Sequence, residues 1–217
     1  MVGPHPRRGI PVNETRRIVL DRIRGALAAS PPEPVHVPRD YDRQPAQGPG
    51  DAERFARTVA EYQAQVLRVD PTAIAATLIR LTGAGARVAI PEGLPTEWVD
   101  GIDVTVDYLE NPLAVTELDR TDAVLTGCAL GIAATGTIVL DAGPTQGRRA
   151  LTLVPDHHIC VVFTDQIVDT VPQAFAALDP SRPLTFISGP SATSDIELNR
   201  VEGVHGPRNL DVLLISR

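Results

Sequence analysis

The chain has 217 residues, 43% of them hydrophobic and 22% charged, which is typical of one packed domain with or without an added arm. All 20 basic residues are Arg, which excludes a lysine Schiff base and a P-loop, and two cysteines exclude a four-cysteine iron–sulfur or zinc site. Residues 1–60 carry a net charge of +3 and residues 61–217 one of −10, summing to −7, so the acidic body argues against nucleic-acid binding.

The first 50 residues predict an N-terminal arm. Asn13 can cap a helix over about residues 13–29, whose apolar side chains recur at roughly helical spacing. Residues 30–50 are rich in Pro and predict an extended linker without a core. We therefore expect an arm over residues 1–50 and a globular domain over residues 51–217.

The globular part alternates helices and strands at both ends and has consecutive strands in its middle. Helices are expected at residues 51–69, 70–81, 94–100, 111–118, 172–178 and 194–199. Strands are expected at residues 87–91, 102–106, 123–128, 137–140, 151–154, 159–163, 184–188 and 210–215. This order predicts an α/β fold with a mainly parallel sheet and inserted antiparallel strands.

The location expected from the sequence is the cytoplasm, without membrane insertion. The chain opens without the pattern of a signal peptide, and no stretch approaches the roughly 18 apolar residues of a membrane span. Cys128 and Cys160 lie inside apolar runs, so we expect both thiols to be buried and free, as is typical of a reducing compartment.

Three stretches occur together in a fixed order, and they carry a family resemblance. They are residues 126–137 (TGCALGIAATGT), residues 148–159 (RRALTLVPDHHI), and GPSATSDIE followed by GVHGPR within residues 188–208. This set resembles the LUD-domain family, and within it the lactate utilization protein C group, over roughly residues 50–217. The resemblance implies a fold similar to the sugar-phosphate isomerase and CoA-transferase α/β fold. Ala134 departs from the glutamate that family members often carry there, so the carboxylate of a CoA-transferase-like nucleophile is missing.

The resemblance also implies a function. It implies a role in oxidising L-lactate to pyruvate, with partner proteins that carry the iron–sulfur chemistry. This chain would be the non-redox member, with no cofactor or metal of its own, and would bind a small carboxylate or hold the complex together. Two other hypotheses remain open: an enzyme that acts alone on a small carboxylate, thioester or phosphosugar at the strand ends, and an assembly module whose N-terminal helix docks a partner.

The first candidate binding loop contains Ser188, Gly189, Ser191 and Thr193. It follows a predicted strand and precedes a predicted helix, where free N–H groups suit a phosphate or a carboxylate. A well-capped helix after a Gly-Pro turn would account for the same residues. We expect this loop to bind substrate.

The second candidate loop ends at Arg208, which can clamp a carboxylate through two hydrogen bonds. His205 can transfer a proton there, and either Asp195 or Glu197 could orient it. His205 and Asp195 are the candidate catalytic residues. The alternative is a rigid turn whose histidine binds backbone.

Two glycine-rich turns add Thr126, Gly127, Thr135 and Gly136 to the predicted substrate-binding residues. No G-x-G-x-x-G sequence follows a strand, so dinucleotide binding has no motif support. A close approach of the glycine backbone to a carboxylate or phosphate remains possible.

The neighbouring charged residues have simpler interpretations. Arg148 and Arg149 could face the same anion, although solvent is the usual place for such a pair. His157 and His158 point to opposite faces of a strand and cannot easily share one metal, so no metal site is expected. Asp156 is expected to brace one of these histidines.

Overall fold

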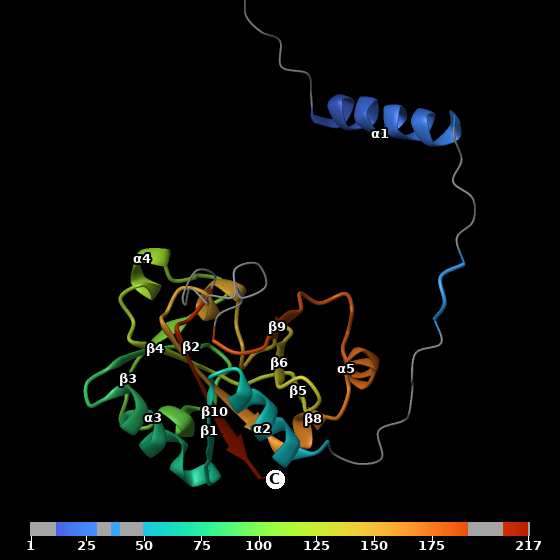
Figure 1. The fold of residues 1–217 in the computed structure, drawn as a ribbon. Coiled ribbons are helices and arrows are strands. Elements are labelled where there is room, and N and C mark those ends of the chain that lie inside the picture. Colours follow the sequence, from blue (N-terminus) through green and yellow to red (C-terminus); the bar gives the residue numbers. More distant parts are fainter. Residues whose placement is uncertain (1–11, 30–35, 40–49, 191–205, 217) are drawn as a thin grey trace, which may run out of the picture. The chain divides into compact units, whose positions relative to one another are not determined.

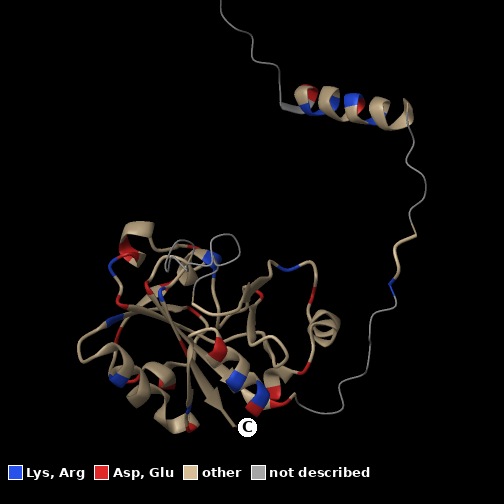
Figure 2. Ribbon diagram, viewed as in Figure 1, with Lys and Arg blue, Asp and Glu red and all other residues tan. Residues whose placement is uncertain are grey.

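The computed structural model describes residues 12–29, 36–39, 50–190 and 206–216 (Figure 1). The chain divides into two compact units, Met1–Tyr41 and Asp42–Arg217. The first unit contains α1 (Val12–Ala29), along which Figure 2 shows basic and acidic residues. Four of its large apolar side chains are 44–55% exposed: Ile18, Val19, Ile23 and Leu27. The expected boundary at residues 50 and 51 stays a prediction.

The second unit is built on a six-stranded sheet in which every pair of neighbouring strands is parallel. Its order is β1 (Gln65–Arg68), β10 (Asn209–Ile215), β7 (His157–Phe163), β4 (Ala123–Thr126), β2 (Arg87–Pro91) and β3 (Asp103–Asp107). The predicted α/β fold with a mainly parallel sheet is therefore confirmed.

The antiparallel strands form a sheet of their own. This four-stranded sheet has the order β8 (Ile167–Val168), β5 (Leu130–Ile132), β6 (Thr137–Leu140) and β9 (Thr185–Ile187). Strand β6 is antiparallel to β5 and β9, and β5 is parallel to β8. We call it the small sheet.

Helices and short helical turns connect the strands. The α-helices of this unit are α2 (Ala52–Glu61), α3 (Ile74–Thr82), α4 (Val115–Leu118) and α5 (Val171–Ala177). The 3₁₀ turns are η1 (Pro71–Ala73), η2 (Thr96–Val99), η3 (Arg149–Thr152) and η4 (Thr164–Gln166). Among the described helices, none is long and apolar enough to cross a membrane.

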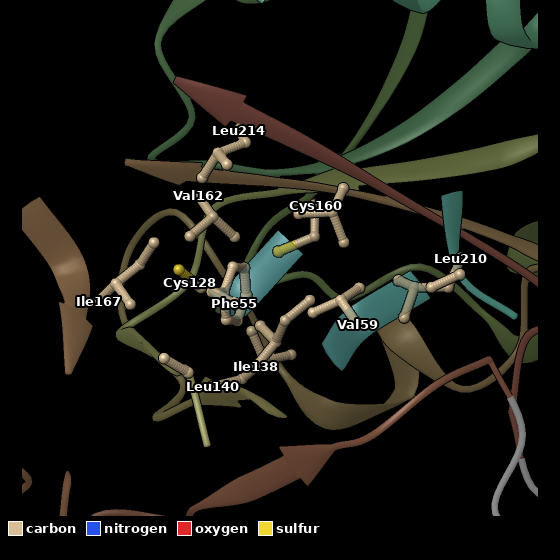
Figure 3. Packing of buried hydrophobic residues seen from close by; sticks show 13 residues of the cluster. Phe55, Val59, Cys128, Ile138, Leu140, Cys160, Val162, Ile167, Leu210 and Leu214 are labelled. Carbon is tan, nitrogen blue, oxygen red and sulfur yellow. The ribbon is translucent and has the colours of Figure 1, made fainter. Parts of the chain in front are cut away.

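Alternation along the central strands buries both faces of the parallel sheet. In β7, Ile159 and Val161 pack in one cluster with α3 and η2. Cys160 and Val162 face the other way, into a cluster with α2 and β6. Figure 3 shows this second cluster, in which the two cysteine sulfur atoms lie among aliphatic and aromatic side chains. The second cluster therefore fills the space between the parallel sheet, α2 and the small sheet.

Two predicted elements are wrong. The helix expected over residues 51–69 ends at Glu61, and Gln63 takes a positive φ of 65°, which turns the chain into β1. Residues 151–154, expected as a strand, lie in and after η3, where Leu151 is buried in a third cluster. The helix expected over residues 194–199 lies outside the described residues.

Candidate functional site

A pocket of about 110 Å³ opens between the small sheet and the amino ends of β7 and β10. Strand β9 and the residues that follow it form one wall, and η3 forms another. Gly206 and Pro207 border it on the side of β10. The pocket lies beside the cluster of Figure 3, because Leu210 belongs both to that cluster and to the pocket lining.

Polar groups from three elements reach this pocket. Arg149 begins η3, is exposed, and donates a hydrogen bond from Nη1 to Oγ1 of Thr185, 3.1 Å away. Ser188 follows β9, and its Oγ lies 2.8 Å from Oγ1 of Thr137. Thr137 is in turn 2.7 Å from the hydroxyl of Thr135. A chain of hydroxyl groups therefore runs from the turn before β6 to the pocket wall.

The imidazole of His158 is a buried part of the pocket lining. Its side chain lies on the same face of β7 as Cys160, and the residue is 1% exposed. Nε2 lies 2.8 Å from Oγ1 of Thr126, whose exposed fraction is 0%. His157 points to the opposite face, where its Nε2 lies 2.8 Å from Oδ2 of Asp211. As expected, the two histidines occupy different environments.

Two free thiols lie deeper in the same cluster. A hydrogen bond with Cys128 lowers the pKa of the Cys160 thiol, and hydrogen bonding and positive charge from His158 act in the same direction against the effect of burial. The same contact and burial raise the pKa of Cys128 well above its usual range. Of the two, Cys160 is therefore the more acidic thiol, and it belongs to the surroundings of His158.

The carboxyl ends of β2, β3 and β4, where open α/β sheets usually bind ligands, are covered by residues 141–148. The N–H of Gly127, just after β4, donates to the carbonyl of Thr145 at 2.8 Å. A Cβ on Gly93, just after β2, would lie 2.6 Å from Pro144. At the end of β3, Asp107 accepts two hydrogen bonds from Arg148. The described pocket therefore lies at the amino ends of strands in this sheet.

Some predicted site residues lie at this pocket and others do not. Ser188 and Gly189 line it, and Thr126 and Thr135 connect to it through His158 and Thr137. Gly127 packs against Thr145.

Gly136 is close to α2 rather than to the pocket lining. Its φ is +57°, and a Cβ there would lie 2.5 Å from the backbone carbon of Thr58. This close approach accounts for the glycine without a ligand.

The remaining predictions concern the second loop. Arg208 is exposed, and its Nη2 lies 2.8 Å from Oδ2 of Asp156. Asp156 was expected to brace a histidine, and that expectation is wrong, because β7 begins after it and both histidine side chains have other partners. Four predicted residues lie outside the described part of the chain: His205, Asp195, Ser191 and Thr193. Ligand binding by all of these residues stays a prediction.

Sequence reasoning underrated two pocket residues. The sequence favours solvent for Arg149, whereas the structure places it at the start of η3, directly after Arg148, whose side chain is bonded to Asp107. His158 was assigned no chemistry. Its position in an apolar strand, two residues before a cysteine, was the available signal that it faces the interior.

The described lining of the pocket brings together the guanidinium of Arg149, several hydroxyls and the imidazole of His158. A guanidinium with hydroxyl donors is an arrangement that binds carboxylates. A volume of about 110 Å³ is far below the roughly 300 Å³ at which pockets for larger ligands begin. Among the described residues there is no cluster of three His, Cys, Asp or Glu side chains placed to hold a metal ion. The arrangement therefore suits a small organic anion.

Comparison with known proteins adds three findings. The model of the LUD domain matches residues 106–215. A protein of Deinococcus radiodurans called lactate utilization protein C is 46% identical over 211 residues, which cover 94% of this chain and 96% of that protein. A protein of the same name from Halalkalibacterium halodurans is 34% identical over 109 residues, covering 46% of this chain and 47% of that protein.

A solved structure is similar as well. The crystal structure of a DUF162 family protein from Deinococcus radiodurans has a TM-score of 0.64 and 43% sequence identity to this chain. The match covers 75% of this chain and 94% of that one. The similarity in fold is therefore accompanied by substantial sequence identity.

Proposed function

The chain belongs to the LUD-domain family, and we propose that it acts in lactate utilization as the component that binds a small carboxylate. The observation that carries the proposal is the pocket lined by Arg149, Thr185, Ser188 and His158. The name of the relative that is 46% identical over nearly the whole chain supports the choice of lactate. Lactate and pyruvate are both small monoanions with one further oxygen.

The charged and the hydroxyl groups of the pocket would recognise different parts of the ligand. The guanidinium of Arg149 would bind the carboxylate, because its hydrogen-bond partner among the described residues is the neutral hydroxyl of Thr185. The hydroxyls of Thr185 and Ser188 can donate to or accept from the second oxygen of the ligand. The described pocket, with a volume of about 110 Å³, is of a size that suits a small carboxylate.

The electrons of lactate oxidation would leave through partners. Cys128 and Cys160, the two cysteines of the chain, are 3% and 0% exposed and both lie in an apolar cluster, so they offer no open ligand set for an iron–sulfur centre. We therefore propose that iron–sulfur proteins of the lactate utilization system carry the redox groups and that this chain binds no cofactor. Both thiols are free, which supports the expected cytoplasmic location.

The test of carboxylate binding is calorimetric titration of the full chain with L-lactate, pyruvate, acetate and inorganic phosphate. We expect the two 3-carbon acids to bind, and Arg149→Ala to weaken them roughly ten- to hundredfold, as loss of a charge-assisted hydrogen bond does. Arg149→Lys should recover little of this, because an ammonium cannot reproduce the planar fork. The matched control is Arg120→Ala, which removes an exposed arginine outside the pocket lining. If Arg149→Ala binds lactate as the wild type does, the proposed pocket is wrong.

The partner proposal has its own test. The exposed apolar side chains of α1 include Ile23 and Leu27, which are 50% and 55% exposed and suit docking on another protein. We expect the double variant Ile23→Asp, Leu27→Asp to lose co-purification with co-expressed iron–sulfur components and to keep lactate binding. Unchanged co-purification would show that α1 is not the docking element.

A further inference from the structure

Resting on the proposed carboxylate site, we propose that Thr135, Thr137 and Ser188 form a reversible chain of hydroxyl groups that lets this site bind a 2-hydroxy acid and the corresponding 2-oxo acid with similar affinity. We call these three side chains the hydroxyl chain. Thr137 is its positioning residue, because it is bonded to Ser188 and lies outside the described lining of the pocket. No covalent bond is made or broken, and only O–H bonds rotate.

Strand pairing holds the middle of the hydroxyl chain in place. Thr137 is the first residue of β6, and Ser188 directly follows β9. The two strands are antiparallel, and their register continues to a pair in which Thr137 stands opposite Ser188. Thr137 is 5% exposed, whereas Ser188 is exposed and lines the pocket. The chain therefore connects a buried hydroxyl to one that a ligand can reach.

The hydrogen bonds of the hydroxyl chain can run in either direction. A hydroxyl carries one hydrogen and two acceptor lone pairs. Oγ1 of Thr137 is 2.7 Å from Oγ1 of Thr135 and 2.8 Å from Oγ of Ser188, and in each pair either oxygen can be the donor. The carbonyl of Thr135, 3.5 Å from Oγ1 of Thr137, can also accept when Thr137 donates toward that turn. The described partners of the Thr137 hydroxyl thus include no charged group that would fix one direction.

The two directions match the two oxidation states of a three-carbon acid. The hydroxyl on C2 of lactate carries a hydrogen, whereas the carbonyl oxygen of pyruvate can only accept. With pyruvate bound, Ser188 would donate to the ligand and accept from Thr137. With lactate bound, Ser188 would accept from the ligand and donate to Thr137, which would donate to Thr135. Ser188 and Thr137 keep a partner for their hydrogen in both cases, so neither ligand leaves these donors unpaired.

The pocket groups Arg149 and Thr185 cannot make this adjustment. The guanidinium of Arg149 only donates, and the carboxylate of the ligand would occupy it. The hydroxyl of Thr185 already accepts from Arg149, and its own hydrogen remains available to either ligand. Among these groups, the response to a hydroxyl or a carbonyl on C2 therefore depends on Ser188, and through it on Thr137.

The experiment is calorimetric titration of the full chain with L-lactate, pyruvate and propionate, which has the carboxylate but no oxygen on C2. We expect the wild type to bind lactate and pyruvate with Kd values within about tenfold of each other. Both should bind roughly two- to tenfold more tightly than propionate, as one neutral hydrogen bond would give. The ratio of the Kd values for lactate and pyruvate tests the hydroxyl chain, because a purely structural role of Thr137 would weaken all three acids alike.

Variants of the hydroxyl chain test the role of each member. Thr137→Val removes the hydroxyl at nearly unchanged shape, so Ser188 would lose the acceptor for its own hydrogen when it accepts from lactate. We expect the affinity for lactate to fall roughly three- to tenfold more than that for pyruvate. Thr137→Ser should restore the ratio, and Thr135→Val should shift it by less, because the carbonyl of Thr135 still accepts. The matched control is Thr121→Val, which removes a buried hydroxyl bonded to the carbonyl of Leu118, outside the pocket lining, and should keep the wild-type ratio.

Two results would overturn the inference and leave the carboxylate site standing. One is a lactate-to-pyruvate ratio that Thr137→Val leaves at the wild-type value. The other is a wild type that binds lactate and pyruvate no better than propionate, or that prefers one of the two by more than about tenfold. Failure of the wild type to bind any of the three acids would refute the proposed function and this inference together.

Discussion

Replacing Arg148 by alanine should destabilise the domain by about 3 kcal/mol, although replacing its neighbour Arg149 should cost little. The guanidinium of Arg148 donates to Asp107 through Nε at 2.8 Å and Nη2 at 3.0 Å, and Nη2 also donates to the carbonyl of Leu113 at 2.6 Å. The side chain of Asp107 is 2% exposed and that of Arg148 is 28% exposed. Truncating Arg148 therefore leaves a buried carboxylate with the N–H of Leu113 as its remaining described donor.

The magnitude follows from that asymmetry. Removing one partner of a buried ion pair costs about 3–5 kcal/mol, and the partial exposure of Arg148 favours the lower end. For a chain of this size, about 3 kcal/mol corresponds to a fall of roughly 6–12 °C in Tm. Asp107→Asn should cost less, about 1–2 kcal/mol, because the guanidinium that it leaves behind can reach water.

Urea denaturation of the variants measures these differences, provided that the m-value stays constant. The double variant Arg148→Ala, Asp107→Asn should cost less than the sum of the two single variants, because both remove the same interaction. Arg149→Ala should stay within about 0.5 kcal/mol of wild type, since its side chain is exposed. Equal stability of Arg148→Ala and wild type would refute this account of the ion pair and of how η3 is positioned.

Two further predictions concern backbone geometry and pH. Gly136→Ala should destabilise the domain by more than about 2 kcal/mol in urea denaturation, because its Cβ would lie 2.5 Å from the backbone of Thr58 at a φ of +57°. Gly101→Ala is the control, with a φ of +74° and nothing within 4 Å, and should cost only about 1–2 kcal/mol. The hydroxyl and the N–H of Thr72 donate hydrogen bonds to Asp70 and lower the pKa of its carboxyl group, the hydroxyl contributing more. This cap therefore stabilises the fold fully above the ordinary aspartate pKa of about 3.9. The stabilisation is lost as the pH falls through the lowered pKa. Asp70→Ala should therefore melt below wild type at neutral pH, and a difference that persists in strong acid would contradict the capping role.

Local patterns in the sequence predicted most of the fold. They failed where contacts with residues distant in the chain determine the secondary structure. The stripe of Phe55, Val59, Tyr62 and Val66 favours one long helix, and the first two residues do pack as expected. Val66 instead lies in β1 and pairs with Val212 of β10. Pairing with a strand so distant in the chain cannot be recognised from the spacing of apolar residues in one segment. The short strands β5 and β8 were missed because three and two residues carry too little pattern.

The site was less predictable than the fold, for a related reason. Glycine and serine residues identified the loop that contains Ser188, because turn residues determine the backbone conformation of their own segment and can be recognised in the sequence. Arg149 and His158 reach the same pocket from η3 and from β7, and only the packing of the small sheet against the parallel sheet brings them together. The family resemblance predicted that a ligand exists, and the position of the described pocket follows from tertiary structure.

The segment over residues 141–148 limits the size of ligand that this sheet can hold. In many α/β proteins a nucleotide binds at the carboxyl ends of the strands, where backbone N–H groups donate hydrogen bonds to its phosphates. Here the N–H after β4 is already bonded to the chain itself, and the Arg148–Asp107 pair fastens the segment beside β3. A mononucleotide seated at β2, β3 and β4 would have to displace eight residues together with a buried ion pair. The connection between β6 and η3 therefore excludes large ligands from the carboxyl ends of these three strands. Substituting the side chains of the pocket would not remove this exclusion.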